Sequence, residues 1–239
     1  MMNGHHEIVD YMSTSEDEEE LFDVLRADNH QPAGHMKPRS AVHRDGDWHR
    51  AAHVWLFCQA TGELLLQQRA AHKDSWPGLW DISAAGHVTA GSDAAATAQR
   101  EVKEELGLSI PAEALEWLFS VTTSSVTNNG AFVNNEVQEV FLVTLAERMP
   151  PCALRLQESE VAGVRWLPAA ELEARLRSGD PAHVPMAADS GYWRLFRILE
   201  SRGSAAAADV RQEALEISLP GGARMKMVMT RRASQPGRS

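Results

Sequence analysis

Three glutamates crowd one face of the helix that the residue pattern predicts over 93–106. Because an α-helix advances by about 100° per residue, Glu101, Glu104 and Glu105 fall within about 100° of one another. An apolar stripe that can pack on a sheet lies beside this face and consists of Ala98, Val102 and Leu106. Repulsion destabilises such a face unless a cation binds it, and Mg²⁺ or Mn²⁺ prefers oxygen ligands of this kind. The spacing alone also fits an ordinary solvated acidic helix face, so the flanking residues have to decide.

The flanking residues place the glutamates in a longer pattern. Gly86 opens it, Arg100-Glu101-Val102 and Glu104-Glu105 follow, and Gly107-Leu108 ends it. This stretch resembles the Nudix box, G-x5-E-x7-R-E-U-x-E-E-x-G-U, in which U is aliphatic. All fixed positions match in one register except the first glutamate, whose place is taken by Ser92. The resemblance implies a Mg²⁺-dependent hydrolase of diphosphates.

The resemblance also implies a role for each residue of the box. The metal, Mg²⁺ or Mn²⁺, would be held by Glu101, Glu104, Glu105 and the carbonyl of Gly86. The residue at position 92 would brace the loop through the box arginine, so Ser92 is expected to affect stability more than chemistry. Ser92 is also a candidate helix N-cap, because a hydroxyl can accept from an otherwise unpaired backbone N–H. Gly107 is expected to end the helix in a left-handed conformation.

Segments outside the box resemble one branch of this family, the isopentenyl-diphosphate isomerases and isomerase-like Nudix hydrolases. The matching segments begin at His49, Leu64, Lys73 and Asn134, and the resemblance covers roughly residues 19–200. It implies an α/β fold, the Nudix α/β/α sandwich with a mixed central sheet. The pattern accordingly predicts a hairpin at 51–57 and 64–68, strands at 117–126 and 137–144, and helices at 169–176 and 192–199.

The branch contains two chemistries, and one residue separates them. The isomerase acts through a cysteine immediately before its glycine-histidine pair, whereas this chain has Ala85 before Gly86-His87. Alanine cannot transfer a proton. The sequence therefore favours cleavage of a pyrophosphate bond by water, in a nucleoside diphosphate linked to another moiety. A prenyl-diphosphate isomerase and a non-catalytic Nudix ligand-binding module remain as alternatives.

The branch suggests further site residues outside the glutamate helix. Arg69 and Lys73 match positions that meet the diphosphate, for which a guanidinium and an ammonium are suited, although both also fit solvated strand ends. Glu136 matches a metal ligand and is a candidate base or additional ligand. His87 is assigned to substrate binding. His49 matches a metal-site histidine of the branch, whereas His43 is displaced in spacing from that pattern. In a hydrolase the histidines, including His43 and His53, also fit core or pocket-rim positions.

Composition limits the partners and the organisation of the chain. The formal net charge of −10 at pH 7 disfavours binding to nucleic acid, and no apolar stretch is long enough to span a bilayer. Cys58 and Cys152 form no secreted framework, so we expect free thiols and a cytoplasmic location. We expect an acidic disordered leader at 1–20, a catalytic domain at 21–200, and a basic, largely flexible tail at 201–239 in which 215–219 and 225–229 could pair as a hairpin. The oligomeric state is left open.

Overall fold

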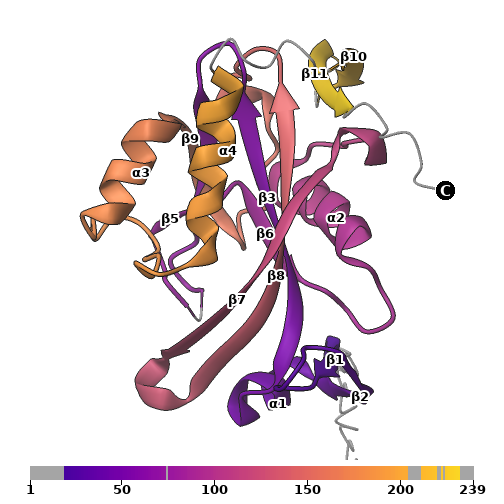
Figure 1. Cartoon of the computed structure of the whole chain (residues 1–239), viewed down its shortest axis with the longest axis vertical. Helices are drawn as coiled ribbons and strands as arrows, with labels where there is room; N and C mark the ends of the chain where they lie inside the picture. The colour runs from indigo at the N-terminus through magenta and orange to yellow at the C-terminus, as the bar shows by residue number, and fades with distance from the viewer. Residues whose placement is uncertain (1–18, 74, 204–210, 220–221, 223, 232–239) are drawn as a thin grey trace, which may run out of the picture.

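A mixed sheet organises the chain (Figure 1). The computed structural model describes residues 19–73, 75–203, 211–219, 222 and 224–231, and within these ranges 11 strands join in one open sheet. Strand β3 (Trp48–Cys58) lies at its centre and runs parallel to β8 (Phe132–Leu145). On its other side β3 pairs antiparallel with β4 (Glu63–Arg69) and with β6 (Ala84–His87). Strand β6, which carries Gly86 at the start of the stretch that resembles the Nudix box, is therefore paired with the central strand of the sheet.

The remaining strands extend the sheet outward from β3, β4 and β8. Strand β7 (Glu116–Thr127) forms a long antiparallel pair with β8. The smaller strands are β1 (Leu21–Leu25), β2 (Pro32–Pro38), β5 (Trp80–Asp81) and β9 (Val161–Pro168). Short 3₁₀ turns connect several strands and comprise η1 (Ala112–Ala114), η2 (Asn128–Gly130) and η3 (Pro151–Ala153).

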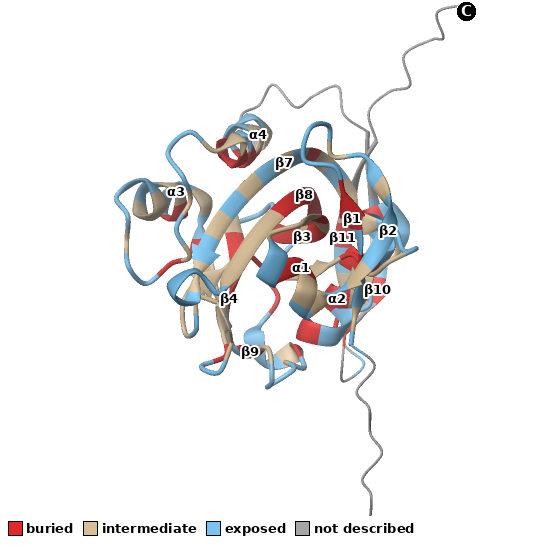
Figure 2. Cartoon of the chain, turned by 90° about the horizontal axis from the view of Figure 1, so that it is seen from below, coloured by how far each residue is buried: buried red, intermediate tan, exposed pale blue. Residues whose placement is uncertain are grey.

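Helices cover both faces of this sheet. On one face, α2 (Ala94–Leu106) buries its apolar stripe against β3, β6 and β8. On the other face lie α3 (Ala169–Arg177), the turn η4 (Gly191–Trp193) and α4 (Arg194–Gly203), which share a second apolar cluster with β3 and β4. A short helix, α1 (Arg39–Asp45), lies near the lower end of β3 and β8 in Figure 1. Buried positions gather on β3 and β8 between the helices in Figure 2. The predicted α/β/α sandwich with a mixed sheet is confirmed.

The predicted elements are present with small changes of boundary. The hairpin of β3 and β4 pairs Phe57 with Leu64, as the strand pattern requires. The helix expected at 93–106 starts one residue later, and the helix expected at 192–199 is a 3₁₀ turn followed by α4.

Two strands form inside the segment that the sequence assigns to a flexible tail. Strands β10 (Arg211–Ser218) and β11 (Arg224–Arg231) pair antiparallel, and Met227 of β11 pairs with Leu145 of β8. Met227 is fully buried, and Ile217 packs in the same apolar cluster as α2. The hairpin suggested at 215–219 and 225–229 is thus present and joins the sheet. Most of the predicted acidic leader lies outside the described residues.

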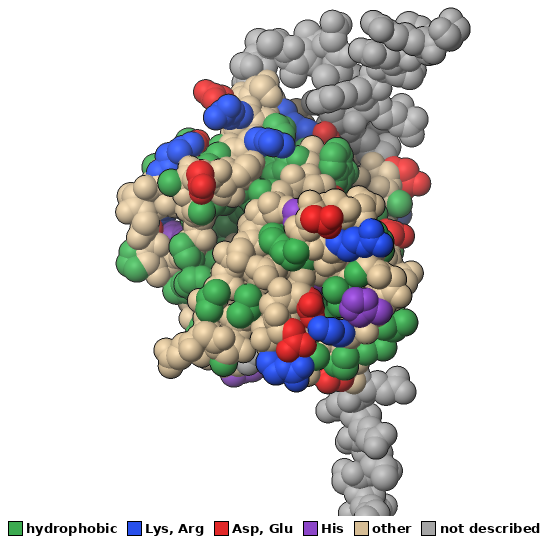
Figure 3. Space-filling view, turned by 60° about the horizontal axis from the view of Figure 1, so that its bottom comes forward, with side chains coloured by type: hydrophobic (Ala, Val, Ile, Leu, Met, Phe, Trp, Pro, Cys, Tyr) green, Lys and Arg blue, Asp and Glu red, His purple; other side chains and the backbone are tan. Residues whose placement is uncertain are grey.

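The surface carries both signs of charge. On the face drawn in Figure 3, acidic and basic side chains are interspersed. No helix in the described part of the chain is long and apolar enough to cross a membrane.

Candidate active site

Helix α2 carries the acidic side chains at the junction of sheet and loop. Asp93 caps its N-terminus, where the side chain accepts a hydrogen bond of 2.8 Å from the backbone N–H of Ala96. The expectation that Ser92 caps the helix is wrong, because Ser92 lies in the preceding turn and its own N–H donates to the carbonyl of Thr89. Gly107 ends the helix with φ of 70°, as expected.

The three glutamates of α2 differ in environment. Glu101 is 9% exposed and Glu105 is 5% exposed, whereas the side chain of Glu104 is 47% exposed. Oε2 of Glu105 accepts hydrogen bonds from Nε2 of Gln67 at 3.0 Å and from the backbone N–H of Ala85 at 3.2 Å. Two of the predicted metal ligands are therefore buried carboxylates, and the third lies at the rim.

Gly86 brings the backbone of β6 against the side chain of Glu101. A Cβ atom added at Gly86 would lie 2.0 Å from Oε1 of Glu101 and 2.1 Å from its Cδ. Real Cβ atoms do not come this close to other atoms, so the approach requires glycine. The box glycine and the first box glutamate of the helix thus lie next to each other.

Burial makes both inner carboxyls weak acids. Loss of solvation raises the pKa of Glu101 to about 7, and loss of solvation together with the nearby charge of Glu101 raises the pKa of Glu105 to about 8. Hydrogen bonds from Ala85 and Gln67 to Glu105 act in the opposite direction. Buried carboxylates of this kind are relieved by a bound cation, so the donor set fits Mg²⁺ or Mn²⁺.

These pKa values predict that Mg²⁺ binding depends on pH. Both carboxyls must release protons to hold the cation, so we expect the affinity for Mg²⁺ to be about 500-fold weaker at pH 6 than at pH 8. Because the folded pKa values lie above the ordinary value of 4.5, the contribution of these carboxyls to the stability of the metal-free chain is present below about pH 4.5. This contribution to stability is lost as pH rises through 7 and 8. Calorimetric titration with Mg²⁺ at pH 6 and at pH 8 measures the predicted change in affinity, and equal affinities at the two pH values would contradict the prediction.

Arg100 contacts the glutamates of its own helix. Its guanidinium lies 2.9 Å from Oε2 of Glu104 and 2.7 Å from Oε1 of Glu101. The usual bracing carboxylate is absent because Ser92 stands at that position. The box arginine therefore neutralises two of the candidate ligands.

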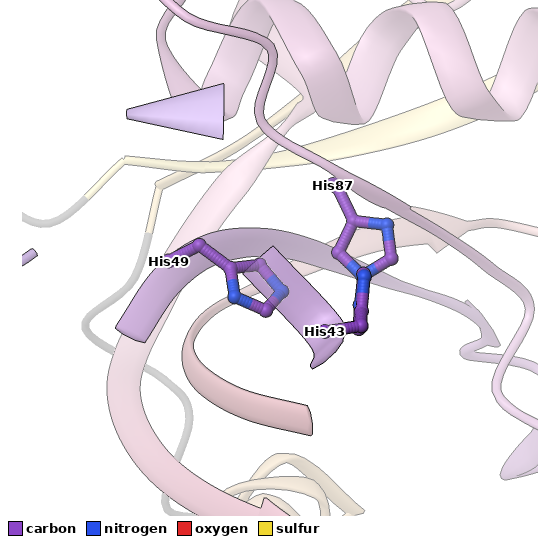
Figure 4. Close-up of side chains that lie close together, drawn as sticks. All are labelled: His43, His49 and His87. Carbon is purple, nitrogen blue, oxygen red and sulfur yellow. The ribbon is translucent and has the colours of Figure 1, made fainter. Parts of the chain in front are cut away.

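Three histidines from separate elements meet beside this acidic site (Figure 4). His43 comes from α1, His49 from β3 and His87 from β6, and their ligand atoms lie within 4.8 Å of one another. Glu136 of β8 joins them, with Oε1 at 3.2 Å from Nε2 of His87. Phe22 packs on this histidine cluster, with its ring centroid 5.3 Å from that of His49.

Two members of the histidine cluster have the tautomer of a metal ligand. Nδ1 of His43 donates to the carbonyl of Arg39 at 2.8 Å, and Nδ1 of His49 donates to the carbonyl of Asp47 at 3.0 Å. In both rings Nε2 is left as an acceptor, and both Nε2 atoms are buried without a hydrogen-bond partner. Metal-binding histidines commonly donate their other N–H to a carbonyl in this way. The cluster is thus a second set of residues that fits a divalent metal.

Glu136 is held in its charged form. Burial raises its pKa, but the hydrogen bond and the charge interaction with His87 hold the pKa well below the ordinary value. Its other oxygen accepts from Nε2 of Gln138 at 2.8 Å. Glu139, three residues further along β8, pairs with Arg50 outside this cluster. Glu136 therefore fits the role of ligand better than that of proton acceptor.

The two predicted diphosphate-binding cations line the same cavity but already have partners. Nη1 of Arg69 lies 3.2 Å from Oδ2 of Asp81, and its Nε donates to the carbonyl of Ser75. Lys73 pairs with Glu160. A bound diphosphate would have to compete with or add to these contacts.

A large cavity lined by described residues brings the acidic and cationic groups together. Its volume is about 1640 Å³, which is ample for a nucleoside diphosphate derivative. Acidic, histidine and cationic groups line it, among them Glu101, Glu105, Glu136, His87, Arg69 and Lys73. Sequence reasoning did not single out Gln67, Asp81 and Tyr192, because each acts through a contact that only the folded chain creates.

Comparison with known proteins shows the family of this chain. The family profile of the NUDIX domain matches residues 47–189, more than half of the chain. The chain belongs to the Nudix family. This Nudix chain is 46% identical over 201 residues to Nudix hydrolase 3 of Arabidopsis thaliana, covering 84% of this chain and only 25% of that protein.

Two other relatives place it near the isomerase branch. An uncharacterized Nudix hydrolase of Listeria monocytogenes is 34% identical over 161 residues, which cover 67% of this chain and 87% of that protein. The isopentenyl-diphosphate Delta-isomerase of Nocardia farcinica is 34% identical over 153 residues, covering 64% of this chain and 82% of that protein. The crystal structure of DR0079 from Deinococcus radiodurans shares the fold, with a TM-score of 0.52 and 19% identity over 77% of this chain and 100% of that chain.

Proposed function

We propose that this Nudix chain is a Mg²⁺-dependent pyrophosphohydrolase that acts on a nucleoside diphosphate linked to another moiety, in the cytoplasm. The observation that carries the proposal is the pair of buried carboxylates, Glu101 and Glu105, held against Gly86 at the wall of a large cavity. Glu101, Glu104, Glu105 and the carbonyl of Gly86 would hold the cation. When bound, Mg²⁺, or Mn²⁺ in its place, supplies polarisation of a phosphoryl oxygen.

The chain's own residues divide the remaining work. Glu105 can accept a proton from the attacking water, because its buried carboxyl lies at the cation site and burial raises its pKa to about 8 in the metal-free chain. Glu104, at the rim, is available to orient that water or to bind the cation. Arg69 and Lys73 lie where they can bind the diphosphate, and the negative charge on the departing phosphate would be met by the same cations.

The histidine cluster supports a second candidate function, that of a prenyl-diphosphate isomerase. The isomerase branch also has histidines at a metal site, and Glu136 matches a metal ligand of that site. Ala85 counts against this second function, since it offers no group for proton transfer next to Gly86. We therefore assign His87 and Glu136 to binding a metal or the substrate within a hydrolase.

A substrate panel tests the proposal. The chain is incubated with Mg²⁺ in ¹⁸O-labelled water and with nucleoside diphosphate derivatives, dinucleotides and prenyl diphosphates, and the products are analysed by mass spectrometry. We expect cleavage of at least one nucleotide, with a single ¹⁸O atom in a phosphate product. Isomerised prenyl diphosphate without phosphate release would overturn the proposal in favour of an isomerase, and binding without any product would favour a ligand-binding module.

A further inference from the structure

His53 stands at the end of a buried hydrogen-bond chain that the proposed chemistry does not use. Nε1 of Trp55 donates to the hydroxyl of Tyr192 at 2.9 Å, and the same hydroxyl lies 3.1 Å from Nδ1 of His53. Trp55 and Tyr192 are 2% and 4% exposed. This series of hydrogen bonds thus links β3 to the turn η4 through the interior of the protein.

The chemistry of Trp55, Tyr192 and His53 shows which atom donates the proton in each of these hydrogen bonds. An indole nitrogen can only donate, so the Tyr192 hydroxyl accepts from Trp55. The hydroxyl has one proton, and burial raises the pKa of Tyr192, so the proton stays and is donated to Nδ1 of His53. Burial also lowers the pKa of His53, which keeps the ring neutral. With Nδ1 as an acceptor, the ring proton is on Nε2.

Packing holds the hydroxyl of Tyr192 in place. Its ring makes edge contacts with Phe119 at 5.9 Å and with Trp55 at 6.3 Å between centroids. The backbone N–H of Tyr192 donates to Oγ of Ser190, which caps the turn. A residue fixed in this way can fix the tautomer of His53.

His53 lines the cavity beside the candidate active site. It faces Ala85 across the β3–β6 pair, and the N–H of Ala85 is bonded to Glu105. The charged or titratable groups that act on its ring are Glu136, Asp81, His87 and Arg69. Within the described part of the chain, Nε2 of His53 makes no hydrogen bond. Because His53 lines the cavity, this donor without a partner is available to a ligand bound there.

We propose that His53 donates a hydrogen bond from Nε2 to a phosphoryl oxygen of the substrate, and that Tyr192 and Trp55 are positioning residues that fix its tautomer. This inference rests on the proposed function, because it takes the diphosphate to bind beside Glu105. A neutral His53 can bind the diphosphate without adding a further positive charge beside the metal site, Arg69 and Lys73.

The tautomer is tested first and without substrate. Long-range ¹H–¹⁵N NMR spectra of the full chain are expected to show His53 as a neutral ring protonated on Nε2. In the Tyr192→Phe variant we expect the Nε2–H form to give way to a mixture of both tautomers, because Nδ1 loses its donor. A ring protonated on Nδ1 in the parent chain, or an unchanged spectrum in Tyr192→Phe, overturns the proposal.

Binding of imidodiphosphate, a pyrophosphate analogue that resists hydrolysis, is tested next with Mg²⁺ present. We expect His53→Leu to weaken binding about tenfold or more, because a hydrogen bond to a charged group is lost. His53→Gln should restore most of the affinity through its amide N–H, and His35→Leu, at an exposed position of β2, should leave it unchanged. Equal affinity in His53→Leu and the parent overturns the inference. The proposed hydrolase fails separately, if no nucleotide of the panel is cleaved by the parent chain.

Discussion

Replacing Glu105 by glutamine is expected to reduce hydrolytic turnover by about three orders of magnitude, equivalent to about 4 kcal/mol of transition-state stabilisation. The amide keeps the shape of the side chain, and its oxygen can still accept from Gln67 and Ala85. It can neither accept a proton nor carry the charge that a cation requires. The measurement is steady-state turnover of the best substrate with saturating Mg²⁺, together with a Mg²⁺ titration of each variant.

Stability separates loss of function from loss of fold in this experiment. The buried carboxyl of Glu105 has a pKa of about 8, so ionising it destabilises the metal-free chain as pH rises toward that value. Metal-free Glu105→Gln should therefore melt no lower than the parent at pH 8, while its stabilisation by Mg²⁺ is reduced. Glu200→Gln, at an exposed position of α4, is the matched control. Unchanged turnover and unchanged Mg²⁺ dependence in Glu105→Gln would remove this residue from the mechanism.

The acidic half of the site could be predicted because it is local in the sequence. Glu101, Glu104 and Glu105 lie on one helix, and helical periodicity alone puts them on one face. Periodicity could not show that Glu104 is half exposed while its two neighbours are buried, since burial depends on how α2 sits against β6. The position of the N-cap was missed for a related reason. Ser92 and Asp93 are both capping residues, and the turn at Thr89 decides between them.

The histidine half of the site depends on contacts between distant segments. Resemblance pointed to His49, whereas the spacing of His43 looked wrong for the same site. The short helix α1 and the left-handed Gly46 that ends it bring His43 back to β3. Such a turn changes the number of residues between His43 and His49 but still leaves the imidazole ring of His43 beside that of His49. The hydrogen bond from Trp55 to Tyr192 could not be predicted for the same reason, because the two residues are 137 positions apart in the sequence.

The C-terminal segment shows what local sequence signals can and cannot predict. Its residue pattern suggested the hairpin of β10 and β11 but not the packing of that hairpin on the core. Small and basic residues beyond Ser201 indicated a composition boundary, yet Ile217 and Met227 add to the core through β10 and β11. These strands gain their stability from pairing with β8 and from burial next to α2, and neither effect can be read from their own composition.

The second large effect is expected at Gly86. In Gly86→Ala the new methyl group would occupy the place of the Glu101 carboxyl, with Oε1 only 2.0 Å away. The end of a glutamate side chain can swing aside, so we expect the chain to fold with a loss of about 1–3 kcal/mol in the free energy of unfolding. Turnover is expected to fall by about two orders of magnitude or more, because one buried ligand leaves the cation site. Gly163→Ala is the control, since a Cβ there meets only Oε1 of Gln68 at 3.9 Å.

A double-mutant cycle shows whether Gly86→Ala acts through Glu101. Once Glu101→Ala has removed the carboxyl, the extra methyl group at Gly86 has nothing to displace. The double variant should therefore be no less active and no less stable than Glu101→Ala alone, which gives a large interaction term between two residues in contact. Additive losses would mean that Gly86 matters for another reason, such as the conformation of β6, and the close approach of backbone and carboxylate would then not explain why this position requires glycine.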